Sequence, residues 1–227
     1  MTEPTPASSP PAVTDDVLIA ASRWTLWRSL ARGLAHSLAN ASQMLALTDP
    51  GPMAREEARE RVSRAAAVLG QFGRPAGAPT PTLLGDVMAD LAELQALQSA
   101  FPSTVLPVEC PAGLPPIGTP ASDLLHALLA IVTNSKEACA PQRAELALRV
   151  EATPDGVRIV LRDAGPGWSA GALEHAFDAA TQPREGHLGT GLAAARVLLR
   201  RSGGDVCVLA ANAGVELRVP AWRRAGA

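Results

Sequence analysis

The sequence predicts an α+β protein in which an N-terminal helical hairpin is followed by a two-layer α/β sandwich. Two long segments near the N-terminus repeat apolar residues at helical spacing, whereas the C-terminal part contains runs that alternate apolar and polar residues as strands do. We place the hairpin within residues 15–75 and the sandwich within residues 80–224. Residues 1–14 are rich in Pro, Ser and Thr, and we expect a disordered tail there.

The composition limits the class of protein and its partners. Of the 227 residues, 47% are hydrophobic, which is enough for a sizeable core, and the net charge of -2 favours neither nucleic acid nor an anionic membrane as partner. The three cysteines are far apart and lack metal-ligand spacing, so we expect reduced thiols. No apolar run approaches ~18 residues. We therefore expect a cytoplasmic protein that binds neither nucleic acid nor membrane.

The first predicted helix runs from Asp15 to about Thr48. Apolar residues at spacings of three and four form one stripe along it, namely Trp27, Leu30, Leu34, Leu38, Ala41 and Leu45. At ~100° per residue, His36 lies roughly opposite the centre of this stripe, on a polar side that it shares with Ser29, Arg32, Asn40 and Gln43. A single histidine is most often incidental, but this placement favours an imidazole that faces solvent.

A second helix follows the break at residues 49–52 and repeats apolar residues at Ala58, Val62, Ala65, Leu69 and Phe72. Two such helices joined by a short loop form an antiparallel hairpin, which leaves one side of each helix uncovered. A second copy of the chain would cover these sides in a dimeric four-helix bundle. The alternative is a monomer in which the hairpin docks on its own C-terminal domain.

The remaining elements follow a Gly- and Pro-rich linker. The pattern predicts a Leu-rich helix over 81–100, a short strand over 104–110 and a helix over 122–140 that stops at Pro141. Residues 145–163 read as a β-hairpin with its turn at 153–156. Helices are then predicted over 171–180 and 192–201, and two last strands over 206–209 and 215–219.

Three stretches carry polar or glycine signals at the ends or margins of these elements. Asn134 and Glu137 lie one turn apart beside the apolar face of the central helix. Asp163 is in phase with the apolar residues of its strand and opens the stretch Asp-Ala-Gly-Pro-Gly, so its carboxylate needs a hydrogen-bond donor. The glycines of residues 186–191 lead directly into a helix, whose N-terminal amides suit a phosphate group.

In this order, the motifs resemble those of the histidine kinases of two-component signalling and their relatives in the gyrase, chaperone and mismatch-repair ATP-binding superfamily. The resemblance covers about residues 30–220, and its specificity lies in the ordered combination. It implies that His36 is the phospho-accepting imidazole and that Asn40 positions water or the partner for dephosphorylation. It also implies ATP and Mg²⁺ as ligands, with Mg²⁺ at Asn134 and the adenine amino group at Asp163. The other nucleotide-binding positions that it implies are Glu137, Gly165, Gly167, Arg184, Gly189, Gly191 and Leu192.

Several positions depart from the family pattern. Ser37 follows the histidine where an acidic residue is usual, Ala41 replaces a proline, Gln182 replaces a lid lysine, and Val215 replaces a threonine. Ser37 and Gln182 weaken the expectation of fast autophosphorylation but leave nucleotide binding expected. Ala130 stands where the hydrolytic relatives carry a general-base glutamate, so a gyrase-like ATPase is not expected.

The resemblance thus implies a homodimeric histidine kinase-like protein that transfers a phosphoryl group from Mg·ATP to His36 and then to the Asp of a response-regulator receiver. Input would come through a partner, such as an upstream sensor protein, or through the short N-terminal tail. Two alternatives remain open: a phosphotransferase or phosphatase scaffold of the same build with a weak ATP site, and a nucleotide-gated binding module that uses no phosphohistidine.

Overall fold

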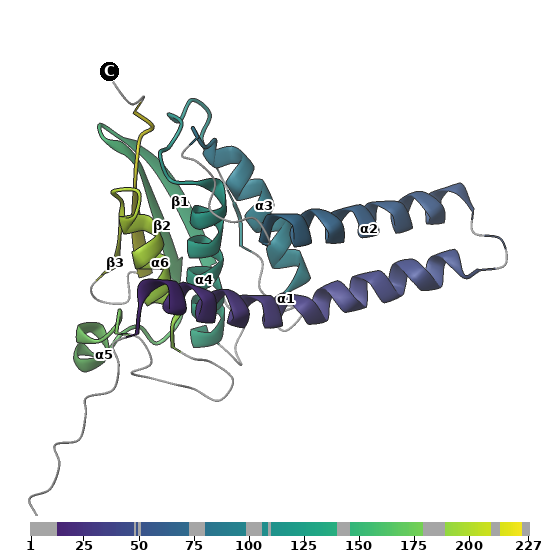
Figure 1. The fold of residues 1–227 in the computed structure, drawn as a ribbon, viewed down its shortest axis with the longest axis horizontal. Helices are drawn as coiled ribbons and strands as arrows, with labels where there is room; N and C mark the ends of the chain where they lie inside the picture. The colour runs from purple at the N-terminus through teal and green to yellow at the C-terminus, as the bar shows by residue number, and fades with distance from the viewer. Residues whose placement is uncertain are drawn as a thin grey trace, which may run out of the picture.

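Two antiparallel helices, α1 (Asp15–Leu45) and α2 (Pro52–Phe72), form a hairpin whose turn end projects away from the rest of the molecule (Figure 1). The structure is a computed structural model, and it describes residues 13–47, 49, 51–72, 80–98, 106–108, 110–139, 146–178, 189–209 and 214–223. At the start of α1 the Thr14 side chain accepts a hydrogen bond from the amide of Val17, and two aspartates occupy the first turn, both favourable at a helix N-terminus. None of the described helices is long and apolar enough to span a membrane.

The C-terminal part is an antiparallel sheet with helices packed on it, as the predicted α+β class requires. Its strands are β1 (Leu146–Thr153), β2 (Gly156–Asp163), β3 (Asp205–Leu209) and β4 (Gly214–Pro220), in the order β1-β2-β4-β3. Its helices are α3 (Leu84–Leu97), α4 (Ala121–Cys139), the short α5 (Ala170–Glu174) and α6 (Gly191–Arg200). The β1–β2 hairpin pairs Leu146 with Asp163, which puts that aspartate at the end of a central strand.

Most predicted elements lie within a few residues of the observed ones, with two differences. The helix predicted over 171–180 is shorter, because α5 ends at Glu174 and the backbone of His175 has already left the helical conformation. The strand predicted over 104–110 falls partly outside the described residues, and inside them Val108 forms an isolated bridge to Leu148.

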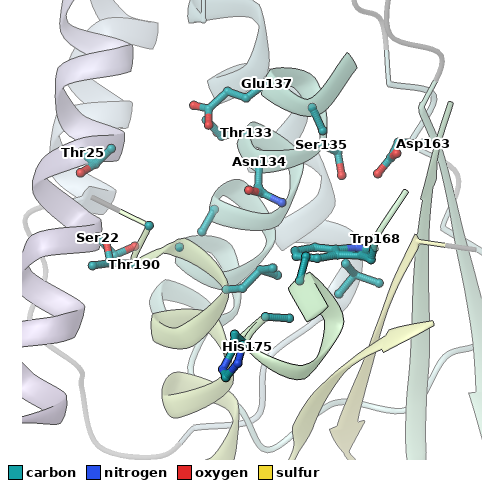
Figure 2. A pocket seen from close by; sticks show the side chains of 18 of the residues that line it. Ser22, Thr25, Thr133, Asn134, Ser135, Glu137, Asp163, Trp168, His175 and Thr190 are labelled. Atoms are coloured by element: carbon teal, nitrogen blue, oxygen red, sulfur yellow. The ribbon is translucent and has the colours of Figure 1, made fainter. Parts of the chain in front are cut away.

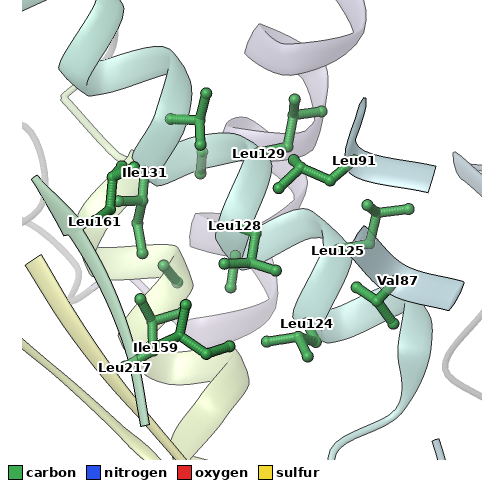
Figure 3. Close-up of a cluster of buried hydrophobic side chains, with 14 of the residues drawn as sticks. Val87, Leu91, Leu124, Leu125, Leu128, Leu129, Ile131, Ile159, Leu161 and Leu217 are labelled. Carbon is green, nitrogen blue, oxygen red and sulfur yellow. The ribbon is translucent and has the colours of Figure 1, made fainter. Parts of the chain in front are cut away.

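Helix α4 is buried on all sides and holds the core together. Residues 124–132 are almost continuously apolar, as expected for a helix with no solvent-facing stripe. Figure 3 shows α4 between the sheet and α3, with one set of its side chains next to the sheet and another next to α3. The side chains labelled in this cluster are Val87, Leu91, Leu124, Leu125, Leu128, Leu129, Ile131, Ile159, Leu161 and Leu217.

The apolar stripe of α1 is covered unevenly. Leu30, Leu34 and Ala41 are buried, whereas Leu38 and Leu45 remain 40% and 51% exposed, and Val62 of α2 is 45% exposed. These exposed side chains lie on the projecting hairpin. A single copy of the hairpin therefore leaves part of its own apolar surface uncovered.

The N-terminal half of α1 lies against the C-terminal domain, next to α4 and α6 (Figure 1). Leu18 packs on Ala193 and Ala194 of α6. Farther along, α1 approaches the end of α3 so closely that a Cβ atom at Gly33 would lie 1.7 Å from the carbonyl oxygen of Leu97. For this half of α1 the structure therefore shows the docking that the sequence left as an alternative.

Candidate functional site

A pocket of about 220 Å³ lies between α1, α4, the turn after β2, the α5 region and the start of α6 (Figure 2). The fold brings together in its wall residues from distant parts of the chain, such as Asn134 and Leu192, which are 58 positions apart. The predicted site residues that line it are Asn134, Glu137, Asp163, Gly167, Gly189, Gly191 and Leu192. Gly165 lies next to it through its contact with Asp163.

Asp163 is half-buried at the end of β2 and keeps one carboxylate oxygen for a ligand. The amide of Gly165 donates a hydrogen bond to Oδ1 over 3.0 Å, and a Cβ atom at Gly165 would lie only 2.8 Å from the same oxygen. Glycine therefore permits this tight turn. Within the described residues Oδ2 accepts no hydrogen bond, so it can receive one from a ligand's amino group.

Oxygen donors and helix amides occupy the rest of the pocket. Asn134 and Glu137 come from neighbouring turns of α4, and their amide and carboxylate oxygens are ligands that suit Mg²⁺. Helix α6 begins at Gly191, and Gly189 before it has a φ of 64°, a conformation that favours glycine. Its N-terminal amides favour an anionic group. This donor set fits a nucleotide with its metal ion.

Trp168 is a wall of the pocket that sequence reasoning missed. Its indole is half-buried against the hydrophobic core and is seen edge-on beside Asp163 in Figure 2. A flat aromatic face in this place suits a purine ring, since bases stack on aromatic side chains. The available signal was an aromatic residue directly after Asp-Ala-Gly-Pro-Gly in a chain that has only 3% aromatic residues.

His36 is exposed on α1 and lies away from this pocket. Its Nε2 atom is 3.2 Å from the amide nitrogen of Asn40, one turn farther along the helix. Because an amide nitrogen only donates, Nε2 accepts this bond and Nδ1 carries the proton. The α1 residue that reaches the pocket nearest to His36 is Leu26, ten positions earlier, or about 15 Å along the helix. Arg184, predicted in the lid, lies outside the described residues.

A buried histidine that sequence reasoning also missed ties α1 to α4. Ser22 Oγ and His126 Nε2 lie 3.0 Å apart, and both side chains are buried. Burial, assisted by the positive charge of Arg23, lowers the pKa of His126 to about 4, so the ring is neutral. Among the described residues His126 Nδ1 has no hydrogen-bond partner, which favours the tautomer in which Nε2–H donates to Ser22.

A second polar link passes through Gln98, just after α3. Its side-chain nitrogen donates to Thr133 Oγ1 over 2.8 Å and lies 3.5 Å from Ser29 Oγ of α1. Its oxygen accepts a hydrogen bond from Lys136 Nζ over 3.1 Å. Lys136 is 2% exposed, and burial lowers the pKa of its amine to about 8. Helix α1 is thus joined to α4 by polar contacts at two levels.

Acid should weaken the folded protein through His126. With a pKa of about 4 when folded and ~6.5 when unfolded, the imidazole takes up a proton mainly on unfolding, so the free energy of unfolding falls as the pH drops from 6.5 towards 4. We expect His126 to account for a loss of about 2 kcal/mol at pH 5. Urea unfolding at pH 7 and pH 5 measures it. The His126→Gln protein should not show this loss of stability, whereas His36→Gln, which changes an exposed imidazole, should show it in full. Equal losses in both variants and the unmodified chain would contradict the role of His126.

The family model for histidine kinase-, DNA gyrase B- and HSP90-like ATPases matches residues 119–222, which carry the α4, β2 and α6 walls of the pocket. This segment therefore matches the ATPase domain that these proteins share. The resemblance and the α+β class predicted from the sequence are therefore confirmed. The ATPase domain supports a kinase-like, ATP-binding function.

Two solved structures of histidine kinases share the fold, and a third matches more weakly. The nucleotide-free catalytic domain of ThkA is 17% identical with a TM-score of 0.56, and the match covers 64% of this chain and 97% of that chain. Full-length ShkA in complex with AMPPNP is 21% identical with a TM-score of 0.50, over 93% of this chain and 47% of that chain. The mycobacterial sensor histidine kinase MprB is 19% identical with a TM-score of 0.49, over 65% of this chain and 100% of that chain. No curated protein matches.

Proposed function

We propose that the chain is a protein histidine kinase whose pocket binds Mg·ATP and whose His36 receives the phosphoryl group. The observation that carries the proposal is the pocket of the ATPase domain, which gathers Asn134, Asp163 and the glycines of 163–167 and 189–191. An exposed imidazole with Asn40 beside it stands on a hairpin joined to that domain. We assign residues 15–75 to the phosphotransfer hairpin and residues 80–224 to the ATP-binding domain.

Each wall of the pocket has a proposed task. Asp163 Oδ2 accepts a hydrogen bond from the adenine amino group, and Trp168 offers its ring to the purine. Asn134 and Glu137 would hold Mg²⁺, which would supply positive charge to offset that of the triphosphate. The glycines before α6 let its amides approach the phosphate oxygens. Arg184 and Leu192 are proposed to complete the site.

In the transfer step, Nε2 of His36 forms a bond with the γ-phosphorus while the bond from that phosphorus to its bridging oxygen breaks and ADP leaves. Since Nε2 accepts a hydrogen bond from Asn40 in this structure, the Asn40 amide must turn away before Nε2 can react. The same amide can afterwards orient a water molecule for dephosphorylation. The phosphoryl group is then passed to the Asp of a response-regulator receiver.

The hairpin is also the proposed dimer interface. Leu38, Leu45 and Val62 remain exposed on it, and Met53 at the start of α2 is exposed as well. A second hairpin packed on these side chains would form a four-helix bundle and remove the apolar surface from water. We propose a homodimer of this kind, which receives its input from an upstream sensor protein.

Incubation with γ-labelled Mg·ATP tests the function against its two rivals. A histidine kinase gives a label on the protein that is stable in base and lost in acid. ATP binding without any label would favour a nucleotide-gated binding module, and the absence of binding would favour a phosphotransferase or phosphatase scaffold with a vestigial site.

The Asp163→Asn change should weaken ATP binding by about 2 kcal/mol, or roughly thirtyfold, because a hydrogen bond to a charged group is lost. A neutral amide cannot accept from both Gly165 and the adenine without turning its NH₂ group towards one of them. Trp168 lines the site, so quenching of tryptophan fluorescence can follow the titration. Asp155→Asn, at an exposed aspartate in the β1–β2 turn, is the matched control, and an equal affinity in the two variants would refute the adenine contact.

A further inference from the structure

The pocket of the ATPase domain is closed by α1 on the side opposite Asp163 (Figure 2). Ser22, Thr25 and Leu26 form this wall. The volume left, about 220 Å³, is below the ~300–1,000 Å³ of ordinary small-molecule sites. The hydroxyl groups of this wall are also engaged within the protein, since Thr25 Oγ1 donates to the carbonyl of Ala21 over 3.1 Å and Ser22 pairs with His126. This wall therefore narrows the pocket with hydroxyl groups that already make hydrogen bonds within the protein.

Contacts of three kinds hold α1 in this place. Leu18 is buried against Ala193 and Ala194 of α6, and the Ser22–His126 hydrogen bond is buried beside α4. At the rim, an Arg201 guanidinium nitrogen donates to a carboxylate oxygen of Asp16 over 2.6 Å. These contacts lie within residues 15–29 of α1, a segment that we call the clasp, and none of them involves His36.

His36 lies on the same face of α1 as the clasp residues Leu18 and Ser22, which carry the buried contacts to α6 and α4. At ~100° per residue, Leu18 has nearly the same direction as His36, Thr25 differs by about 20° and Ser22 by about 40°. Thr25 and His36 are eleven residues apart, or about 16 Å along the axis. A shift of the ATPase domain along α1 by about three turns, with little rotation, would therefore place His36 where Thr25 now borders the pocket.

We propose that the clasp is an autoinhibitory contact. It narrows the nucleotide pocket and holds the ATPase domain about three helical turns away from His36. Phosphorylation then requires the domain to leave the clasp and move along the same face of α1. The inference rests on the proposed kinase function. In a homodimer the clasp would act whichever copy supplies the imidazole, because each pocket is bordered by its own α1.

The Leu18→Glu change tests the clasp, because it puts a carboxylate into the α1–α6 contact without touching the pocket. Leu18 is 7% exposed, whereas its neighbour Val17 is 58% exposed, so Val17→Glu adds the same charge on the same turn as the control. We expect Leu18→Glu to raise the rate of His36 labelling about tenfold or more, since a buried leucine contributes at least that factor to a docking equilibrium. Nucleotide should also associate faster. Amide hydrogen exchange in residues 15–29 should rise while the strands keep their protection, and Val17→Glu should behave like the unmodified chain.

The experiment distinguishes a failure of the clasp from a failure of the proposed kinase function. If exchange shows that Leu18→Glu releases the clasp, yet labelling and nucleotide association keep their rates, the autoinhibitory role is overturned and the kinase stands. If association becomes faster but His36 is never labelled in any protein, the kinase is overturned while the clasp over the pocket stands. Should Leu18→Glu unfold the chain, Asp16→Arg replaces it. That change turns an exposed ion pair into a repulsion, and we expect a rise of about two- to fivefold in both rates; unchanged rates would overturn the clasp.

Discussion

The His36→Ala change is expected to abolish the acid-labile label that the chain acquires from γ-labelled Mg·ATP. Under the proposed mechanism this imidazole is the sole acceptor, so its removal leaves no nitrogen to form the phosphorus bond. Because His36 lies outside the pocket, the affinity for nucleotide should be unchanged. Labelling and equilibrium binding on the same sample therefore separate a lost acceptor from a damaged site.

One result would contradict this assignment directly. His175 lines the pocket and its Nδ1 atom lies 2.7 Å from a carboxylate oxygen of Asp178. If label persisted in the His36→Ala protein, His175 would be the first alternative acceptor to examine, and the hairpin would lose its proposed role in phosphotransfer.

The second large effect is expected at Gly33, where α1 meets the end of α3. A Cβ atom there would lie 1.7 Å from the carbonyl oxygen and 2.7 Å from the carbonyl carbon of Leu97, so the two backbones must separate. The forced separation should cost about 1–3 kcal/mol or more. This cost should exceed the ~1 kcal/mol that alanine gains over glycine in a helix, so Gly33→Ala should destabilise the junction. Thermal unfolding and the hydrogen exchange of α1 amides between residues 18 and 34 measure the change.

Gly70 of α2 supplies the matched control. An added Cβ atom at Gly70 meets nothing within 4 Å, so Gly70→Ala should raise stability by about the helix-propensity difference alone, close to 1 kcal/mol. The two substitutions are chemically identical and should have opposite signs. A Gly33→Ala protein as stable as the unmodified chain would mean that α1 and α3 do not touch in solution.

Much of the fold could be predicted because its signals are local. The turn that ends at Gly156 and the stop before Pro141 are encoded within a few residues, and the strand periods fix which faces are buried. The strand order β1-β2-β4-β3 could not be predicted in this way, because the alternation of apolar and polar residues in a strand does not determine which strands pair with it. The prediction of a helix beyond Glu174 was wrong, because the residues there favour a helix but the backbone leaves the helical conformation at His175.

The contribution of α1 to the pocket wall could not be predicted from the sequence, for a different physical reason. Ser22 and Thr25 are polar residues in a helix, and a polar face indicates contact with water unless another part of the chain covers it. His126, the partner of Ser22, is 104 positions away in an apolar helix, so neither residue suggests the other. By contrast Asn134 and Asp163 were predictable as site candidates, because each sits at a break in an otherwise apolar pattern.

Acylation of the Lys136 amine can report whether this protein is folded. It is the chain's only lysine, and its amine is enclosed between α4 and Gln98. Reagents that acylate primary amines will therefore find no exposed side-chain amine in the native protein. Acylation at position 136 will mark those molecules that have opened.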